Sequence, residues 1–213
     1  MKKYELTAEF IEKWGKKLFR IKALISFGSV EAGELGGYVE KEDNLAQNGN
    51  AWVCDDAEVY GNARVYGNAW VCDDAEVFGN ARVCGDARVF GNARVCGNAE
   101  VCDDARVFGN ARVFGNAEVC GNAEVFDDAD YLLIGRIGSR FSFTTFFKNK
   151  DKGITVSCGC FLGTIAEFRA KVTDTHGNNK HAKMYNLAAD MAELQILGEE
   201  HFDKLNTNKS EPF

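Results

Sequence analysis

The sequence predicts a mainly β protein built around a parallel β-helix. Residues 51–128 form an unbroken run of thirteen six-residue repeats, each with Ala in the first position and Val in the third. The first eighteen residues of this run recur almost unchanged in the next eighteen. Short β stretches precede the run, and two helical stretches follow it. We expect an N-terminal β cap at 1–44, a β-helix at 45–130, a C-terminal α+β module at 131–205 and a flexible tail at 206–213.

The first element is a small β unit. Two alternating stretches, Lys3–Leu6 and Leu18–Ile25, are accompanied by Gly15 and Gly28 as turn markers. Alternation interrupted by turn residues is typical of a hairpin. An uncovered end of a β-helix would expose unpaired backbone and invite aggregation. We therefore expect this hairpin to cover the open end of the stack.

Each six-residue repeat reads as one short strand and one corner. Ala and Val alternate with variable residues, which is the period of a strand. Most repeats close with Gly-Asn or Asp-Asp, and these residues tolerate tight or left-handed backbone. The eighteen-residue recurrence then makes one triangular coil of three strands and three corners. Coils would stack about 4.8 Å apart, because a single coil cannot bury its own face. Leu45–Asn50 resembles a degenerate repeat that starts the stack.

At this point the chain resembles the left-handed β-helix, or hexapeptide-repeat, superfamily. This likeness implies a left-handed parallel β-helix of about five triangular coils; the period alone does not give the handedness. The starter segment, Gly36-Gly37-Tyr38-Val39-Glu40, Asn44-Leu45-Ala46-Gln47 and Gly49-Asn50-Ala51-Trp52-Val53, is similar to that of YdcK-like bacterial and phage proteins. That resemblance implies no assigned activity.

Outward positions of the coils predict a surface for self-association. If Val points inward, the position after it points outward, and there the repeats carry Tyr, Phe or Cys. Soluble monomers seldom expose so much contiguous apolar surface, so we expect a homo-oligomer, a trimer or a dimer. The alternative is that the aromatic columns stabilise the coils by stacking. The predicted interface residues are Phe90, Phe108, Phe126, Tyr60, Phe78, Phe114, Trp52 and Trp70.

Charged positions of the coils form columns of their own. Eighteen residues per coil place Glu76 next to Arg94, and Arg82 next to Glu100. Exposed pairs of this kind contribute little each. We therefore expect a solvated surface that helps to set the register.

The eight cysteines are expected to be reduced. Without a signal peptide, cysteines indicate thiols rather than a disulfide framework. Stacked Cys84, Cys102 and Cys120 would lie near the Cα separation of real disulfides, about 4.4–6.8 Å. A thiolate metal site is an alternative. We favour free cysteines used as small apolar residues, and we expect neither a metal nor a cofactor.

The C-terminal region predicts a ββαα module. Phe141–Lys148 and Ile154–Phe161 have the pattern of strands, and Thr164 begins a capping box. One helix would follow it and end at Gly177, and a second would span Lys180–Leu197. The second helix carries Leu187, Met191 and Leu194 on one face.

A glycine- and arginine-rich segment in this module is the best candidate for an anion site. Arg136, Gly138, Ser139 and Arg140 lie close together. Glycine lets a backbone approach a ligand, and two arginines with a serine could hold phosphate, as in a nucleotide-like ligand. A strand bend with surface arginines explains the segment equally well.

Candidate catalytic residues are scarce. Residues 51–128 contain no His, Ser, Thr or Lys, and the chain's three histidines are His176, His181 and His201. Acyltransferases of the resembled superfamily use a histidine as general base. The alternative function is therefore a CoA-dependent acyltransferase that uses His176. We favour a non-catalytic binding or scaffold protein. It would bind a protein partner or a small anionic ligand, as a phage-type sequestering protein would.

The charge distribution and the hydropathy of the sequence indicate which classes of partner to exclude. The net charge is −7. Residues 51–128 sum to −8, and the rest of the chain sums to +1. An acidic repeat lacks the basic surface that nucleic acid requires. No apolar stretch is long enough to cross a bilayer, and the first ten residues do not resemble a signal peptide. We expect a cytoplasmic protein with no nucleic-acid or membrane partner.

Overall fold

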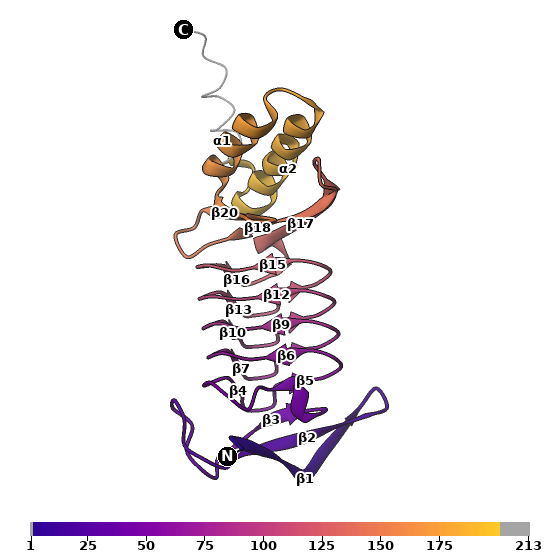
Figure 1. The fold of residues 1–213 in the computed structure, drawn as a ribbon, viewed down its shortest axis with the longest axis vertical. Coiled ribbons are helices and arrows are strands. Elements are labelled where there is room, and N and C mark those ends of the chain that lie inside the picture. Colours follow the sequence, from indigo (N-terminus) through magenta and orange to yellow (C-terminus); the bar gives the residue numbers. More distant parts are fainter. Residues whose placement is uncertain (1, 201–213) are drawn as a thin grey trace. The chain divides into compact units, whose positions relative to one another are not determined.

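The computed structural model describes residues 2–200 and confirms the predicted mainly β fold (Figure 1). The chain divides into two compact units, one that ends at Asn122 and one that begins at Ala123. The predicted tail at 206–213 and His201 lie outside the described residues. Among those that are described, no helix is long and apolar enough to cross a membrane.

The first unit contains the predicted parallel β-solenoid. Each repeat forms a two-residue strand, which pairs in parallel with the strand one coil further along, as Val59 pairs with Val77. Three parallel sheets result, and about five coils are stacked (Figure 1). The handedness of the coil stays a prediction. The strands of this unit's repeats are β4 (Trp52–Val53), β5 (Glu58–Val59), β6 (Arg64–Val65), β7 (Trp70–Val71), β8 (Glu76–Val77), β9 (Arg82–Val83), β10 (Arg88–Val89), β11 (Arg94–Val95), β12 (Glu100–Val101), β13 (Arg106–Val107), β14 (Arg112–Val113) and β15 (Glu118–Val119).

The interior of the solenoid is made of the repeated Ala and Val side chains. From Ala51 to Val119, each of these residues is at most 1% exposed. The backbone of one coil donates to the next, as the N–H of Tyr60 does to the carbonyl oxygen of Val77 at 3.0 Å. The alternation of Ala and Val therefore specifies which side chains are buried. The backbone N–H and C=O groups between them form their hydrogen bonds with the neighbouring coils.

The corners of the coils use glycine or aspartate at a position with left-handed backbone. Gly61 has a φ of +73°, and Asp55, Asp73 and Asp103 have φ values of +54°, +58° and +57°. Aspartate tolerates this left-handed conformation better than most residues. Its carboxylate also accepts the N–H of the equivalent position in the next coil, at 2.8 Å from Asp73 to Gly91. These aspartates therefore connect successive corners.

A disulfide joins two neighbouring coils. Cys54 and Cys72 occupy the same position in successive coils, and their Cα atoms are 4.7 Å apart. Parallel stacking places equivalent positions within the range that a disulfide requires. The expectation that all cysteines are reduced is therefore wrong for this pair.

The N-terminal cap is a hairpin that continues one sheet of the solenoid. Strands β1 (Tyr4–Lys13) and β2 (Lys16–Ala23) are antiparallel, and Trp14-Gly15 forms the turn between them. Strand β3 (Leu35–Val39) pairs with β2 on one side and with β5, in parallel, on the other. This confirms the predicted hairpin. Strand β1 is longer than the predicted stretch Lys3–Leu6, whereas β2 has the predicted length but begins two residues earlier than Leu18.

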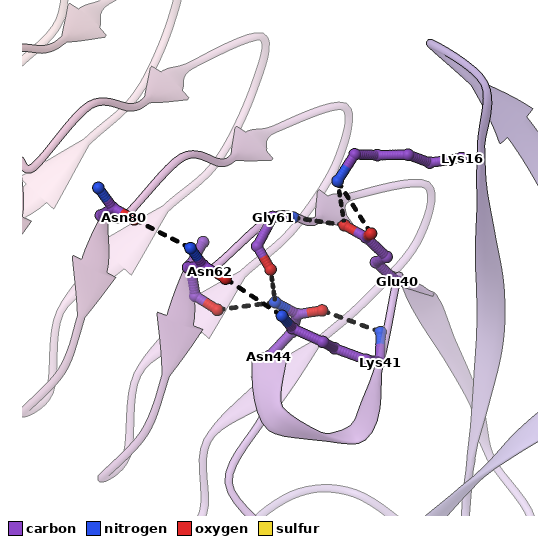
Figure 2. A network of polar contacts seen from close by, with 8 residues as sticks. Lys16, Glu40, Lys41, Asn44, Gly61, Asn62 and Asn80 are labelled. Atoms are coloured by element: carbon purple, nitrogen blue, oxygen red, sulfur yellow. Dashed lines mark hydrogen bonds and ion pairs between the residues drawn. The ribbon is translucent and has the colours of Figure 1, made fainter.

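Side chains of the starter segment form hydrogen bonds with backbone groups of the first complete coil (Figure 2). The side-chain nitrogen of Asn44, which is fully buried, donates to the carbonyl oxygens of Gly61 at 3.2 Å and Ala63 at 2.8 Å. Asn44 ends the short 3₁₀ helix η1 (Glu42–Asn44). The carboxylate of Glu40 accepts the N–H of Gly61 at 2.6 Å and an ammonium hydrogen bond from Lys16 at 2.8 Å. Leu45 then forms a parallel bridge with Val65, which confirms the degenerate first repeat.

Lys3 is a buried cation beneath the cap. It is 2% exposed, and its ammonium group donates to the carbonyl oxygens of Ala51 at 2.8 Å and Gly49 at 3.4 Å. The same group lies 4.8 Å from the ring centre of Phe27. Burial lowers the pKa of Lys3 from 10.5 to about 8.

The buried ammonium of Lys3 should make stability depend on pH. Between pH 8 and 10.5, the folded chain binds fewer protons at Lys3 than the unfolded chain does, so stability rises with pH in this window. We expect the free energy of unfolding to rise by about 1–2 kcal/mol between about pH 8 and 9.5, relative to a Lys3→Met variant. Urea denaturation at several pH values measures this, and parallel pH profiles for the two proteins would contradict it.

The second unit is an antiparallel sheet of four strands with two helices on one face (Figure 1). Phe146 and Val156 from the sheet pack against Phe168, Tyr185 and Ala189 from the helices. The capping box between Thr164 and Glu167 is confirmed. The elements are β16 (Glu124–Val125), η2 (Asp128–Asp130), β17 (Tyr131–Ile137), β18 (Ser142–Lys148), β19 (Ile154–Cys158), β20 (Phe161–Thr164), α1 (Ile165–His176) and α2 (Lys180–Leu197).

The sheet of this unit has two strands more than the sequence predicted. Ile154–Phe161 is not one strand, because it turns at Gly159, whose φ is +62°, and Cys158 pairs with Phe161. Cys160 is then an exposed turn residue. Cys158 and Cys160 therefore do not lie on one face of a single strand.

Candidate functional site

The solenoid carries the charged columns that its period predicts. Arg94 contacts Glu76 at 2.8 Å, and Arg82 and Glu100 are register partners. From the cap hairpin, Lys13 reaches both Glu58 at 2.5 Å and Glu76 at 3.2 Å. Burial alone would raise the pKa of Glu76, but its hydrogen bonds to Lys13 and Arg94 outweigh burial and lower this pKa. These carboxylates fasten the hairpin to the coils.

Open clefts lie where the cap meets the faces of the solenoid. A cleft of about 1040 Å³ is lined by polar residues that include Arg64, Arg82 and Asn80. Another of about 510 Å³ contains Asp56, Glu76 and further charged residues. Both are shallow surfaces with mixed charge, and neither brings together a nucleophile and a base.

The aromatic columns stack within the chain. The rings of Tyr60 and Phe78 lie 5.1 Å apart and 2° from parallel. Those of Phe90 and Phe108 lie 5.1 Å apart and 5° from parallel. This arrangement supports a ladder that stabilises the coils. A subunit interface on the same columns stays a prediction.

Trp52, one of the predicted interface residues, is not at the surface. It is fully buried, and the rings of Tyr4 and Phe27 pack edge-on against it at 6.4 Å and 5.4 Å. Trp52 occupies an outward position of its repeat, but the N-terminal segment covers it, so the expectation that it lies at a subunit interface is wrong. Trp70, one coil further along, is half-buried.

The glycine- and arginine-rich segment is placed on β17 and the turn that follows. Arg136, Ser139 and Arg140 are exposed. Gly138 is buried, and a Cβ atom there would overlap the phenol oxygen of Tyr185. Packing against Tyr185, rather than approach to a ligand, accounts for this glycine. The three exposed residues remain a predicted anion site.

Tyr185 contacts Gly138 and His176, two residues that were predicted as sites, although no sequence pattern marked Tyr185 itself. The ring of His176 stacks on it, 5.8 Å between centres, and His181 lies 5.8 Å from His176. Burial, together with the neighbouring Cys158, raises the pKa of Tyr185 to about 12. Thr144 donates to the sulfur of Cys158 at 3.2 Å. These contacts describe a packed polar cluster at one end of the module's core.

Helix α2 exposes a row of large apolar side chains. One face of this helix is buried against the module's own sheet and α1. The opposite face exposes four residues, and the exposed fractions are 39% for Met184, 64% for Leu187, 57% for Met191 and 45% for Leu194. We call these four residues the α2 face. The sequence indicated three of them as one apolar face of the helix, but it did not indicate that the other face would be the one that packs.

Comparison with known proteins supports the solenoid. Residues 57–73, 81–97 and 105–121 match a family model described as the YdcK beta solenoid repeat. All three segments lie within the stacked coils, so the similarity concerns the repeat. A search of curated proteins finds no match.

Proposed function

We propose that this protein is a non-catalytic scaffold that self-associates through the α2 face. The observation that carries the proposal is the exposure of Met184, Leu187, Met191 and Leu194 on a helix whose opposite face is already buried. Soluble monomers seldom leave an apolar row of this kind in water. Two copies of the rigid solenoid would then be held together in a dimer.

The spacing of the α2 face suits a second copy of the same helix. Its members follow one another at intervals of three, four and three residues, which is the pattern of the paired positions in a coiled coil. Two identical helices related by a two-fold axis can interdigitate such rows, because each residue on one copy meets its complement on the other.

Charge favours an antiparallel arrangement of the two helices. Lys180 and Lys183 are exposed at the start of α2, and Glu199 and Glu200 are exposed just beyond its end. In an antiparallel pair, the lysines of one copy come close to the glutamates of the other. A parallel pair would place like charges together. Because four side chains per copy make a small interface, we expect a dissociation constant of about 1–100 μM.

Replacing Leu187 by aspartate should abolish this association. The variant would bury an unpaired carboxylate from each copy, and each costs about 1–3 kcal/mol or more. We expect the dissociation constant to rise about 100-fold or more. Sedimentation velocity over a range of concentrations measures this. Leu162→Asp is the matched control, because Leu162 is 47% exposed but lies on β20 of the same unit.

Unchanged association of Leu187→Asp would refute the α2 face as the interface. The aromatic columns of the solenoid, including Phe90 and Phe108, would then be the next candidates. A wild-type chain that stays monomeric at about 500 μM, well above the expected dissociation constant, would refute self-association itself.

An anionic ligand and an acyltransferase activity are separate proposals. The first would use Arg136, Ser139 and Arg140, and the second would use His176 as general base. Thermal-shift screening against nucleotides and acyl-CoAs tests both. Stabilisation by an acyl-CoA, with turnover that is lost in His176→Ala, would favour the enzyme over the scaffold.

A further inference from the structure

Two thiols and a carboxylate converge on one corner of the solenoid. The sulfur atoms of Cys102 and Cys120 and a carboxylate oxygen of Asp103 all lie within 4.8 Å of one another. Cys102 and Cys120 follow Val101 and Val119, which are register partners in successive coils. The stacking of the coils therefore brings the two thiols together, and the corner adds the carboxylate.

The carboxylate of Asp103 is held in place by the backbone. One of its oxygens accepts the N–H of Gly121 at 3.0 Å, and the same oxygen lies 4.0 Å from the sulfur of Cys102. Asp103 is exposed, whereas Cys102 is half-buried and Cys120 is buried. The cluster is thus fixed by the fold and opens to solvent at the carboxylate.

The three ligand atoms suit a divalent cation. Its positive charge stabilises two thiolates and a carboxylate that lie close together. Thiolate ligands select zinc-like ions, whereas magnesium and calcium prefer oxygen ligands.

We propose that Cys102, Asp103 and Cys120 bind a thiophilic divalent cation of the zinc class. The two sulfur atoms and one carboxylate oxygen supply three ligands, and water supplies the fourth. Binding replaces the two S–H bonds by two metal–sulfur bonds and releases two protons to the buffer. The ion links two successive coils.

A second cluster of the same composition supports this assignment. Cys54, Asp55 and Cys72 have ligand atoms equally close together, and there the two thiols are joined as a disulfide. Among the described residues, the repeat thus twice brings together two cysteine sulfurs and a carboxylate. The sulfurs of one cluster link their coils through a covalent bond, whereas those of the other keep their thiols and can hold an ion.

Titration of the reduced full-length chain with cadmium tests the site. The titrated chain carries Cys54→Ser and Cys72→Ser, so that this pair contributes no ligands. We expect an ultraviolet cadmium–thiolate band that saturates at one ion per chain and that disappears in Cys120→Ser. Zinc should compete for the same site and raise the melting temperature by about 5–10 °C at a hundredfold excess over its dissociation constant.

Single replacements distinguish this ligand set from its neighbours. Cys96→Ser is the matched control, because Phe78 and Phe114 occupy the same position in the adjacent coils, and it should bind cadmium normally. Cys84→Ser should also bind normally, since that thiol contacts Tyr66 and Glu100. Asp103→Asn, which keeps an oxygen for the Gly121 N–H, should weaken binding at least tenfold, because replacing even a residue that only supports a ligand usually costs about 10–100-fold in metal affinity.

Two results would overturn the proposal. Cadmium binding by Cys120→Ser that equals binding by Cys96→Ser would show that the cluster is not the site. Loss of binding in Cys84→Ser would place the ion between a different pair of coils. Circular dichroism of each variant establishes that it is folded, and Cys120→Ala replaces Cys120→Ser if the serine variant is not.

Discussion

Replacing Asn44 by aspartate is expected to lower the free energy of unfolding by about 3–5 kcal/mol. The side-chain amide of Asn44 is fully buried and donates to the carbonyl oxygens of Gly61 and Ala63 (Figure 2). A carboxylate in its place would direct negative charge at two acceptors and would lose both hydrogen bonds. The carbonyl groups of Gly61 and Ala63 would then be left without these donors.

Asn80→Asp is the matched control for this change. The side chain of Asn80 accepts from Asn62 at 3.2 Å and donates to Asn98 at 3.0 Å, in an exposed ladder. The same substitution there should cost less than about 1 kcal/mol, because water can replace the lost contacts. Guanidinium denaturation measures both variants. Equal destabilisation would mean that Asn44 does not hold the first coil in place.

Replacing Gly36 by alanine is expected to cost about 2–4 kcal/mol. A Cβ atom at this position would overlap the carbonyl oxygen of Val53 and would lie 2.7 Å from side-chain atoms of Ile21 and Trp52. The carbonyl oxygen belongs to the backbone of the first coil, so it cannot turn aside as a flexible side chain can. The cap strand β3 would have to move away from the solenoid.

Gly153→Ala is the control for Gly36→Ala. The nearest atom to a Cβ at Gly153 is 3.6 Å away, so the change should alter stability by less than about 0.5 kcal/mol. Thermal denaturation compares the two, and near-ultraviolet circular dichroism reports whether Trp52 keeps its packing. A Gly36→Ala protein with unaltered stability and spectrum would show that the cap adjusts without cost.

Most of the solenoid could be predicted because its information is local and repeated. The alternation of Ala and Val specifies the buried columns, and the eighteen-residue period specifies which residues stack. The predicted pairing of Glu76 with Arg94 follows from that period, and the structure confirms it. The helices of the second unit were also predictable, because Thr164 and Gly177 mark the ends of the first.

The corrections concern contacts between segments that are distant in the sequence. Trp52 occupies an outward position of its repeat, and nothing within the repeat indicates that Tyr4 and Phe27 cover it. Gly138 is explained by Tyr185, a residue from a different helix. Local pattern gives the direction of a side chain, but it does not give what packs against it.

The candidate site was predictable only in part for the same reason. Leu187, Met191 and Leu194 were recognised as one apolar face of a helix. The choice between two apolar faces was decided by the alanine-rich side around Ala189, which packs closely on the sheet. Small residues permit this close approach, so the larger side chains were left at the surface.

The eighteen-residue register has a consequence at the level of the gene. Residues 51–68 and 69–86 are near-copies, and unequal recombination between the DNA that encodes them adds or removes one whole coil. Every buried column and every charged column then continues unbroken, because each coil contacts only its neighbours. An insertion of a single repeat would instead shift all later repeats onto the next face and would separate Glu76 from Arg94. The length of this solenoid can therefore change over generations in steps of one coil, while the charged columns select against smaller steps.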